Sequence, residues 1–99
     1  MKDHSHNELM EYLCKGILTL ETPEECKRFL EDLCTMSELE EMSRRLHAAK
    51  MLKSNHVYSE IAEATGLSTA TISRVNRCLK YGSDGYLTVL ERMERQEHH

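Results

Sequence analysis

The stretch that decides the fold is residues 58–77, which read YSEIAEATGLSTATISRVNR. It has the layout of a helix-turn-helix, in which two helices are joined by a short turn. Gly66 suits the end of the first helix, because glycine adopts a left-handed backbone without strain. Thr65, just before it, stands at a position that is more often apolar. Ser68 is a typical N-cap, whose oxygen accepts a hydrogen bond from a free N–H of the second helix. We therefore expect a helix-turn-helix over about residues 58–81.

Apolar residues fall where the two helices of this motif would pack together. Ile61 would fill the angle between them, and Ala62 is small where the second helix crosses close by. Leu67 would close the corner, while Ile72 and Val75 return to the core at helical spacing. The second helix therefore has one face committed to the core.

The opposite face of the second helix carries the residues that would meet a nucleic acid. Small polar side chains at its N-terminal end can enter the major groove of DNA, and basic ones further along can reach phosphates. Thr71 lies between the two faces and could offer either its methyl group or its hydroxyl to a base. The candidate DNA-binding residues are Ser68, Thr69, Ala70, Thr71, Ser73, Arg77 and Lys80. Arg74 shares the outward face.

The charge of the chain is distributed unevenly. The 99 residues carry a net charge of −4. Residues 1–41 hold 4 basic and 11 acidic side chains, residues 42–82 hold 7 basic and 2 acidic ones, and residues 83–99 hold 2 basic and 4 acidic ones. A polyanion responds to the local field of a face, since exposed charges more than about 10 Å away are screened at ordinary salt. The middle of the chain is therefore the candidate working surface.

The composition favours a single all-α domain over residues 1–99. One proline and four glycines are too few for a β-rich fold, and 30% charged residues without a long apolar run argue against disorder and a membrane span. A chain this short buries only about two-thirds of its unfolded surface, so a second copy would add much to its stability. We expect dimerisation helices over about residues 5–53 and 86–97.

Three amphipathic helices are expected before the helix-turn-helix, and one after it. The second would begin with Thr22 as N-cap and Pro23 as its first residue, and the third with a capping box from Ser37 to Glu40, ending near Lys53. The stripes of the first two helices either cover a core within the chain or pair with a second subunit, and shared burial favours the second interpretation. The third stripe should face inward, and the last should contact the core or the dimer partner. The stripes comprise Leu9, Tyr12, Leu13, Gly16, Ile17 and Leu20; Cys26, Phe29, Leu30 and Leu33; Leu39, Met42, Leu46, Ala49 and Leu52; and Tyr86, Leu87, Val89, Leu90 and Met93.

No constellation typical of an enzyme or a metal site occurs. The four cysteines have no C-x-x-C spacing, and the close histidine pairs, His4/His6 and His98/His99, lie at the chain ends. A Gly-rich phosphate loop and a Ser-His-Asp set are both missing. We expect no metal, no cofactor and no catalysis. Because no signal-like apolar segment follows the first residues, we expect a cytoplasmic protein, and the acidic final helix argues against a membrane-surface role.

In Ala70-Thr71-Ile72-Ser73-Arg74 and in Leu79-Lys80, the chain resembles the tryptophan repressor family and its YerC/YecD-type branch. The resemblance covers about residues 37–86. It implies an all-α, six-helix chain that intertwines with a second copy into a homodimer presenting two recognition helices. In that family, the residues matching Thr69, Ala70 and Thr71 approach the bases, and the residue matching Ser73 contacts phosphate. A twofold dimer would read half-sites about 34–36 Å apart.

The resemblance also implies a ligand slot. The family's tryptophan-responsive members hold the indole of tryptophan between two arginines, which match Arg44 and Arg74 here. The residue after the second arginine is a glycine in those members and Val75 in this chain, whose branched side chain should fill part of the slot. We therefore expect tryptophan to bind weakly or not at all. Arg44 and Arg74 would then bind phosphate, pair with acidic residues or hold another small molecule.

Two functions follow from these patterns. The first is a sequence-specific DNA-binding transcriptional regulator, a repressor by resemblance, that reads the major groove of double-stranded DNA and is open to control by an unidentified small molecule. The alternative is a helical protein-interaction module that uses the helix-turn-helix only as a scaffold. Retention on duplex DNA that falls steeply with salt distinguishes the two, because each neutralised phosphate releases counterions. RNA is disfavoured, since its major groove excludes a helix.

Overall fold

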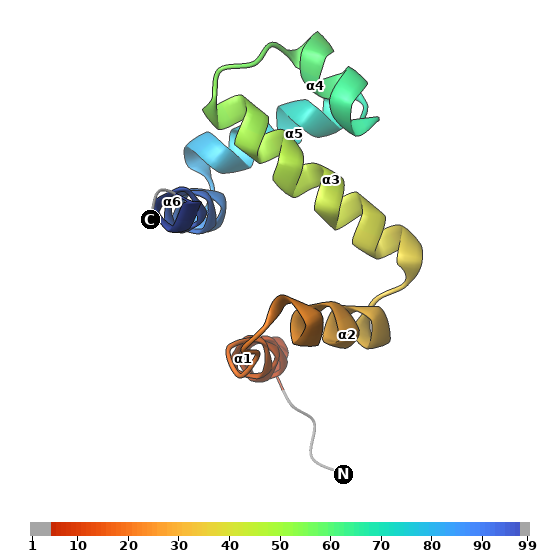
Figure 1. Ribbon diagram of the computed structural model, residues 1–99, viewed down its shortest axis with the longest axis vertical. Helices are drawn as coiled ribbons and strands as arrows, with labels where there is room; N and C mark the ends of the chain where they lie inside the picture. Colours follow the sequence, from red (N-terminus) through yellow and green to blue (C-terminus); the bar gives the residue numbers. More distant parts are fainter. Residues whose placement is uncertain (1–4, 98–99) are drawn as a thin grey trace. The chain divides into compact units, whose positions relative to one another are not determined.

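The computed structural model describes residues 5–97, and within this range the chain forms six α-helices and no strand (Figure 1). The predicted all-α, six-helix architecture is therefore confirmed. The chain divides into two compact units, the first up to Leu39 and the second from Glu40 onward. The helices are α1 (His6–Ile17), α2 (Pro23–Leu33), α3 (Met36–Lys53), α4 (Tyr58–Thr65), α5 (Thr69–Tyr81) and α6 (Gly85–Glu97).

Helix α2 begins where the sequence predicts. Thr22 is its N-cap, and the Thr22 hydroxyl accepts a hydrogen bond from the Glu25 N–H at 3.1 Å. Pro23 follows as the first helical residue, where its missing N–H leaves no intrahelical bond unmade. The Glu25 carboxylate reaches one residue further back than in a standard capping box and accepts from the Glu21 N–H at 2.9 Å.

Helix α3 begins earlier than predicted, and its capping box uses other residues. Thr35, not Ser37, caps the helix: its hydroxyl accepts from the Glu38 N–H at 3.2 Å, and the Glu38 carboxylate accepts from the Thr35 N–H at 2.8 Å. The prediction of a capping box from Ser37 to Glu40 was therefore wrong. Thr35 and Ser37 are each followed three positions later by a glutamate, Glu38 and Glu40, which is the spacing of a capping box. The earlier pair forms the cap.

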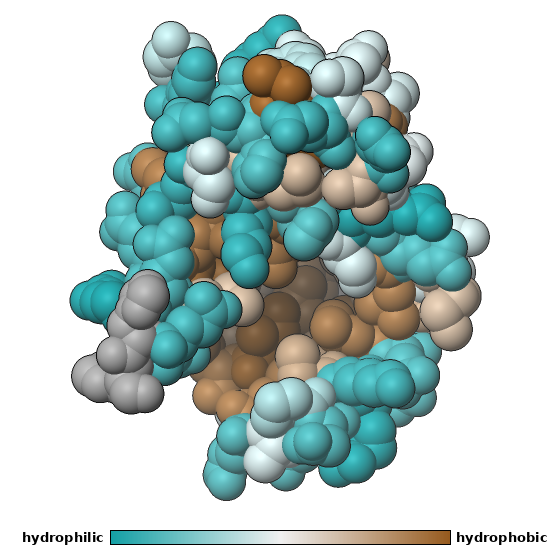
Figure 2. All heavy atoms as spheres, turned by 45° about the horizontal axis from the view of Figure 1, so that its top comes forward, coloured by the Kyte–Doolittle hydropathy of each residue, from teal (hydrophilic) through white to brown (hydrophobic). Residues whose placement is uncertain are grey.

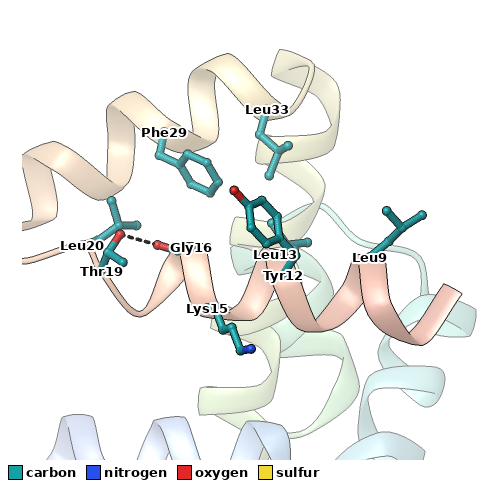
Figure 3. A pocket seen from close by; sticks show the side chains of 9 residues that line it. All are labelled: Leu9, Tyr12, Leu13, Lys15, Gly16, Thr19, Leu20, Phe29 and Leu33. Atoms are coloured by element: carbon teal, nitrogen blue, oxygen red, sulfur yellow. Dashed lines mark hydrogen bonds between the residues drawn. The ribbon is translucent and has the colours of Figure 1, made fainter. Parts of the chain in front are cut away.

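The described residues of the first unit, 5–39, include many apolar side chains but no buried one. No residue of α1 or α2 is buried. An apolar groove of about 590 Å³ runs between the two helices, with Phe29 and Leu33 of α2 pointing toward α1 (Figure 3). Tyr12, on the groove wall, is 81% exposed. The predicted apolar stripes of these helices are present, but the single chain leaves them largely open. The groove is lined by Leu9, Tyr12, Leu13, Lys15, Gly16, Thr19, Leu20, Phe29 and Leu33.

The second unit contains the hydrophobic core. Ile61 and Ile72 are its largest fully buried side chains, and each contributes about 1.5–3 kcal/mol by leaving water. The predicted core residues Leu67 and Val75 are buried with them. The complete cluster is Ala48, Ala49, Ile61, Leu67, Ile72, Val75, Leu79 and Leu90. Helices α3, α4, α5 and α6 therefore each supply residues to the core that supports the helix-turn-helix.

The inward face of α3 differs in part from the prediction. Ala48 and Ala49 are both fully buried, although the apolar spacing points only to Ala49. Met42, expected to face inward, is exposed in the single chain. The two alanines carry small side chains that contribute little to an apolar stripe in sequence. They nevertheless allow close packing of α3 against the cluster.

Helix α6 joins the core through Leu90 and is linked to α3 by one ion pair. Leu90 lies in the core, and the Lys53 Nζ atom donates to both carboxylate oxygens of Glu94, at 3.1 and 3.2 Å. Val89 and Met93 of the same helix remain exposed. On the face drawn in Figure 2, brown hydrophobic side chains lie beside teal hydrophilic ones.

Candidate nucleic-acid interface

The turn between α4 and α5 has the geometry that the sequence predicts. Gly66 has a φ of 75° and a ψ of 6°, in the left-handed region, and its N–H donates to the Ala62 carbonyl at 2.8 Å. A residue with a Cβ would be strained there. Val57 precedes α4, and its N–H donates to the Glu60 carboxylate at 3.0 Å. The two ends of α4 are thus fixed by local hydrogen bonds.

The hydrogen bonds of Thr65 account for a polar residue at a position of the helix-turn-helix that is more often apolar. It is only 7% exposed, yet both hydrogen-bonding functions of its side chain are used. The hydroxyl donates to the Ile61 carbonyl at 2.7 Å and accepts from the Leu67 N–H at 3.2 Å. The threonine hydroxyl therefore gives the Leu67 N–H a hydrogen-bond acceptor in the turn. An apolar side chain at this position would provide none.

Helix α5 presents two distinct faces, as predicted. Ile72, Val75 and Leu79 are buried. The outward side chains are exposed, and the basic ones follow the small polar ones along the helix toward its C-terminal end. These exposed residues are Thr69, Ala70, Ser73, Arg74, Arg77 and Lys80. The structure therefore brings the candidate DNA-contacting residues onto one accessible face, while their contacts with DNA remain a prediction.

The N-terminal end of α5 is held by a pair of hydroxyl residues. Ser68 is the N-cap, and its Oγ accepts from the Thr71 N–H at 3.1 Å. The Ser68 hydroxyl also donates to the Thr71 Oγ1 at 3.0 Å. Ser68 is exposed and Thr71 is half-buried. The Thr71 side chain is therefore directed back toward the cap at the edge of the outward face.

One exposed residue of this face was missed in the sequence. Tyr81, the last residue of α5, is 84% exposed. It follows Arg77 by four positions and Arg74 by seven, so the three share one side of the helix. Helical spacing continued past Lys80 would have found it. The aromatic side chain extends the basic face at its C-terminal end.

The two candidate ligand-binding arginines lie on different helices of the second unit. Arg44 is on α3 and Arg74 on α5, and both are exposed. The Arg44 guanidinium lies 3.9 Å from the Glu40 carboxylate, one turn earlier on the same helix. Val75, beside Arg74, is only 2% exposed and belongs to the core. The position after the second arginine is thus filled by a packed, branched side chain.

Comparison with known proteins identifies the family. The model of the Trp repressor protein family matches residues 8–94. The chain belongs to the Trp repressor family. It is 47% identical over 88 residues to the uncharacterised protein YerC of Bacillus subtilis (strain 168), a match that covers 89% of this chain and 85% of that protein. The resemblance seen in the sequence is therefore confirmed, and the family is one of DNA-binding regulators.

Two solved structures share the fold. A TrpR-like protein from Eubacterium eligens ATCC 27750 superposes with a TM-score of 0.84 and 49% identity, over 88% of this chain and 90% of its own. A candidate Trp repressor from Staphylococcus aureus superposes with a TM-score of 0.83 and 44% identity, over 93% and 96%. The six-helix arrangement described above is thus the arrangement of TrpR-like proteins.

Neither a metal site nor a membrane span occurs in the part of the chain that the structure describes. Among residues 5–97, no group of three or more His, Cys, Asp or Glu side chains is placed to hold a metal ion. His4, His98 and His99, named above as close histidine pairs with His6, lie outside the described residues. No helix in that range is long and apolar enough to cross a bilayer.

Proposed function

We propose that this protein is a sequence-specific DNA-binding transcriptional regulator that reads the major groove with α5. The observation that carries the proposal is the outward face of α5, which places small polar side chains at the N-terminal end and Arg77 and Lys80 further along, all exposed. The first group can approach base edges and the second can neutralise phosphates. Membership of the Trp repressor family supports the same conclusion.

The proposed contacts divide by position on α5. At Ser68, the N-terminal end of α5 offers free N–H groups and a partial positive charge to an approaching phosphate. Thr69, Ala70 and Thr71 would meet base edges, and Ser73 would bind a phosphate. Since DNA is the proposed partner, we infer a cytoplasmic location.

The test is duplex binding at several salt concentrations. A duplex is first selected from a random pool, and its dissociation constant is then measured for the wild type, Arg77→Ala and Arg95→Ala. We expect Arg77→Ala to bind all duplexes more weakly and to lower the salt slope by about one for each α5 helix on the duplex, since each copy then leaves one phosphate unneutralised. For a homodimer the slope therefore falls by about two.

Arg95 provides the matched control, because it is exposed on α6 and its loss changes the net charge equally. Arg95→Ala should bind as the wild type does. If both variants bind alike, or if no duplex is retained by the wild type at low salt, the assignment of α5 to the major groove is wrong. The protein-interaction module would then be the better interpretation.

We further infer that the regulator acts as a homodimer. Neither α1 nor α2 contains a buried residue, and the groove between them exposes apolar walls. A second copy would cover these walls and would present two α5 helices to one duplex. Twofold symmetry then predicts a palindromic site with half-sites about 34–36 Å apart.

Tryptophan is not the expected effector. In the tryptophan-responsive members that the chain resembles, the residue after the second arginine is a glycine, whereas Val75 here is buried and branched. Isothermal titration with L-tryptophan should give no micromolar binding, and a micromolar dissociation constant would contradict this. Arg44 and Arg74 remain the candidate residues for another anionic or planar small molecule.

A further inference from the structure

We propose that Thr71 recognises a thymine through its methyl group and not through its hydroxyl. This inference rests on the proposed function, because it assumes that α5 enters the major groove. It assigns a chemical role to one residue of that helix and predicts a required thymine in each half-site.

The hydrogen bonds at the start of α5 carry the argument. The Ser68 hydroxyl donates to the Thr71 Oγ1 at 3.0 Å, while the Ser68 Oγ accepts from the Thr71 N–H at 3.1 Å. The first bond directs the Thr71 Oγ1 toward the cap, and the second holds the Thr71 backbone N–H beside the same Ser68 oxygen. A threonine held in one rotamer has its methyl group in a different staggered position from its hydroxyl. The methyl group is therefore the part of the side chain that is not committed to the cap.

Thr71 lies at the edge of the outward face, between the exposed residues of α5 and its buried ones. Thr71 is half-buried, whereas the neighbouring Thr69 and Ala70 are exposed. An apolar methyl at the edge of the outward face gains most from meeting another apolar group. In the major groove, the apolar group on a base edge is the C5 methyl of thymine. Methyl-to-methyl contact would distinguish thymine from cytosine without any hydrogen bond from Thr71.

The experiment uses the full chain and two near-isosteric substitutions. Thr71→Val keeps a methyl in that position and removes the hydroxyl, whereas Thr71→Ser keeps the hydroxyl and removes the methyl. A duplex selected by the wild type is compared with duplexes in which one thymine at a time is replaced by uracil, which lacks only the methyl group.

We expect one replacement in each half-site to weaken wild-type binding by about three- to fivefold, the effect of one buried methyl group. Thr71→Val should show the same loss at that position. Thr71→Ser should bind the thymine and uracil duplexes equally, because the two methyl groups act only together.

Controls separate failure of this inference from failure of the proposed function. Thr88→Val and Thr88→Ser make the same changes at an exposed threonine on α6, and both should respond to uracil as the wild type does. Thermal unfolding of each variant shows whether it is folded, and the uracil series on the wild type requires no variant at all.

The contradicting results are distinct. Absence of any duplex bound by the wild type would overturn the proposed function. Three other results would overturn the role of the methyl group alone. The wild type could bind with no loss at any uracil, or the selected site could require no thymine. The preference for thymine over uracil could also survive in Thr71→Ser and disappear in Thr71→Val.

Discussion

At the scale of single residues, the corner between α4 and α5 depends on one backbone conformation. Gly66 has a φ of 75°, and the space around it is open, with nothing within 4 Å of where a Cβ would stand. Substitution there is therefore costly through backbone strain alone and not through a clash.

We expect Gly66→Ala to lower the free energy of unfolding by about 1–2 kcal/mol, measured by chemical denaturation. Gly85→Ala is the matched control, because Gly85 also has open space but lies at the start of a helix without a left-handed φ. It should be neutral or slightly stabilising. Equal stability of the two variants would contradict the role given to Gly66.

Gly82 illustrates a different constraint on the same residue type. A Cβ at this position, which ends α5, would collide with the carbonyl oxygen of Cys78. Gly82 is needed for space, whereas Gly66 is needed for conformation. The sequence identified Gly66 as a helix end, but the different reasons for the two glycines require the coordinates.

At the scale of the helices, the cap of α5 combines stability with the proposed recognition of DNA. Ser68 accepts from the Thr71 N–H, and an aspartate would accept equally well while favouring the positive helix end. Stability and DNA affinity can therefore be separated at this residue.

We expect Ser68→Asp to unfold at the wild-type temperature or above, yet to bind a selected duplex more than about tenfold more weakly, because its charge repels the phosphates. Thr22→Asp makes the same kind of change at the cap of α2. It should leave DNA affinity unchanged, as measured by fluorescence anisotropy. Equal losses of affinity in both variants would mean that the effect of charge is not local to α5.

The cap of α3 makes stability depend on pH. The Thr35 N–H, and then the Thr35 side chain, hydrogen-bond to Glu38 and lower the pKa of its carboxyl from the usual value near 4.5. A lowered pKa in the folded state stabilises the protein above the unfolded pKa, and this contribution is lost as pH falls through the folded pKa.

We therefore expect Glu38→Gln to be less stable than the wild type at pH 6–7, with a gap that closes as the pH is lowered below about 4. Denaturant titrations of both proteins at a series of pH values measure the gap. A difference that stays constant down to about pH 2 would show that the carboxylate charge contributes nothing.

How far the sequence predicts these helices depends on how local their causes are. The turn from Gly66 to Ser68 follows from rules that involve a few neighbouring residues, so it was predicted to the residue. The start of α3 offered two equivalent pairs, and nothing local distinguishes Thr35 from Ser37. Ala48 was missed because its burial depends on helices distant in sequence. The outward face of α5 is what remains once the core-facing positions are assigned, and the sequence predicted this face except for Tyr81.

At the scale of the whole molecule, the first unit leaves its apolar groove open. Phe29 and Leu33 line this groove, and in α1 and α2 no residue is buried. In the homodimer that we propose, these walls would be shared with the second copy. Association would then bury apolar surface that one chain this small leaves exposed.

We expect Phe29→Asp to shift the protein from dimer to monomer, because an unpaired charge in an apolar interface is strongly unfavourable. Sedimentation equilibrium measures the shift. Val57→Asp adds the same charge at an exposed apolar residue outside the groove and should remain dimeric. A dimer in both variants would place the interface elsewhere, and a monomeric wild type would contradict the homodimer.

The lack of any buried residue in α1 and α2 has a consequence for the abundance of the protein. In the proposed dimer, folding of these helices and association form one equilibrium, so the melting temperature rises with protein concentration. Dilution would then release not an intact monomer but a chain with an unprotected N-terminal third, open to proteases. In a cell that makes few copies, a larger fraction of the chains would be dissociated, so each molecule would be degraded faster. Occupancy of the operator would then fall more steeply than the copy number.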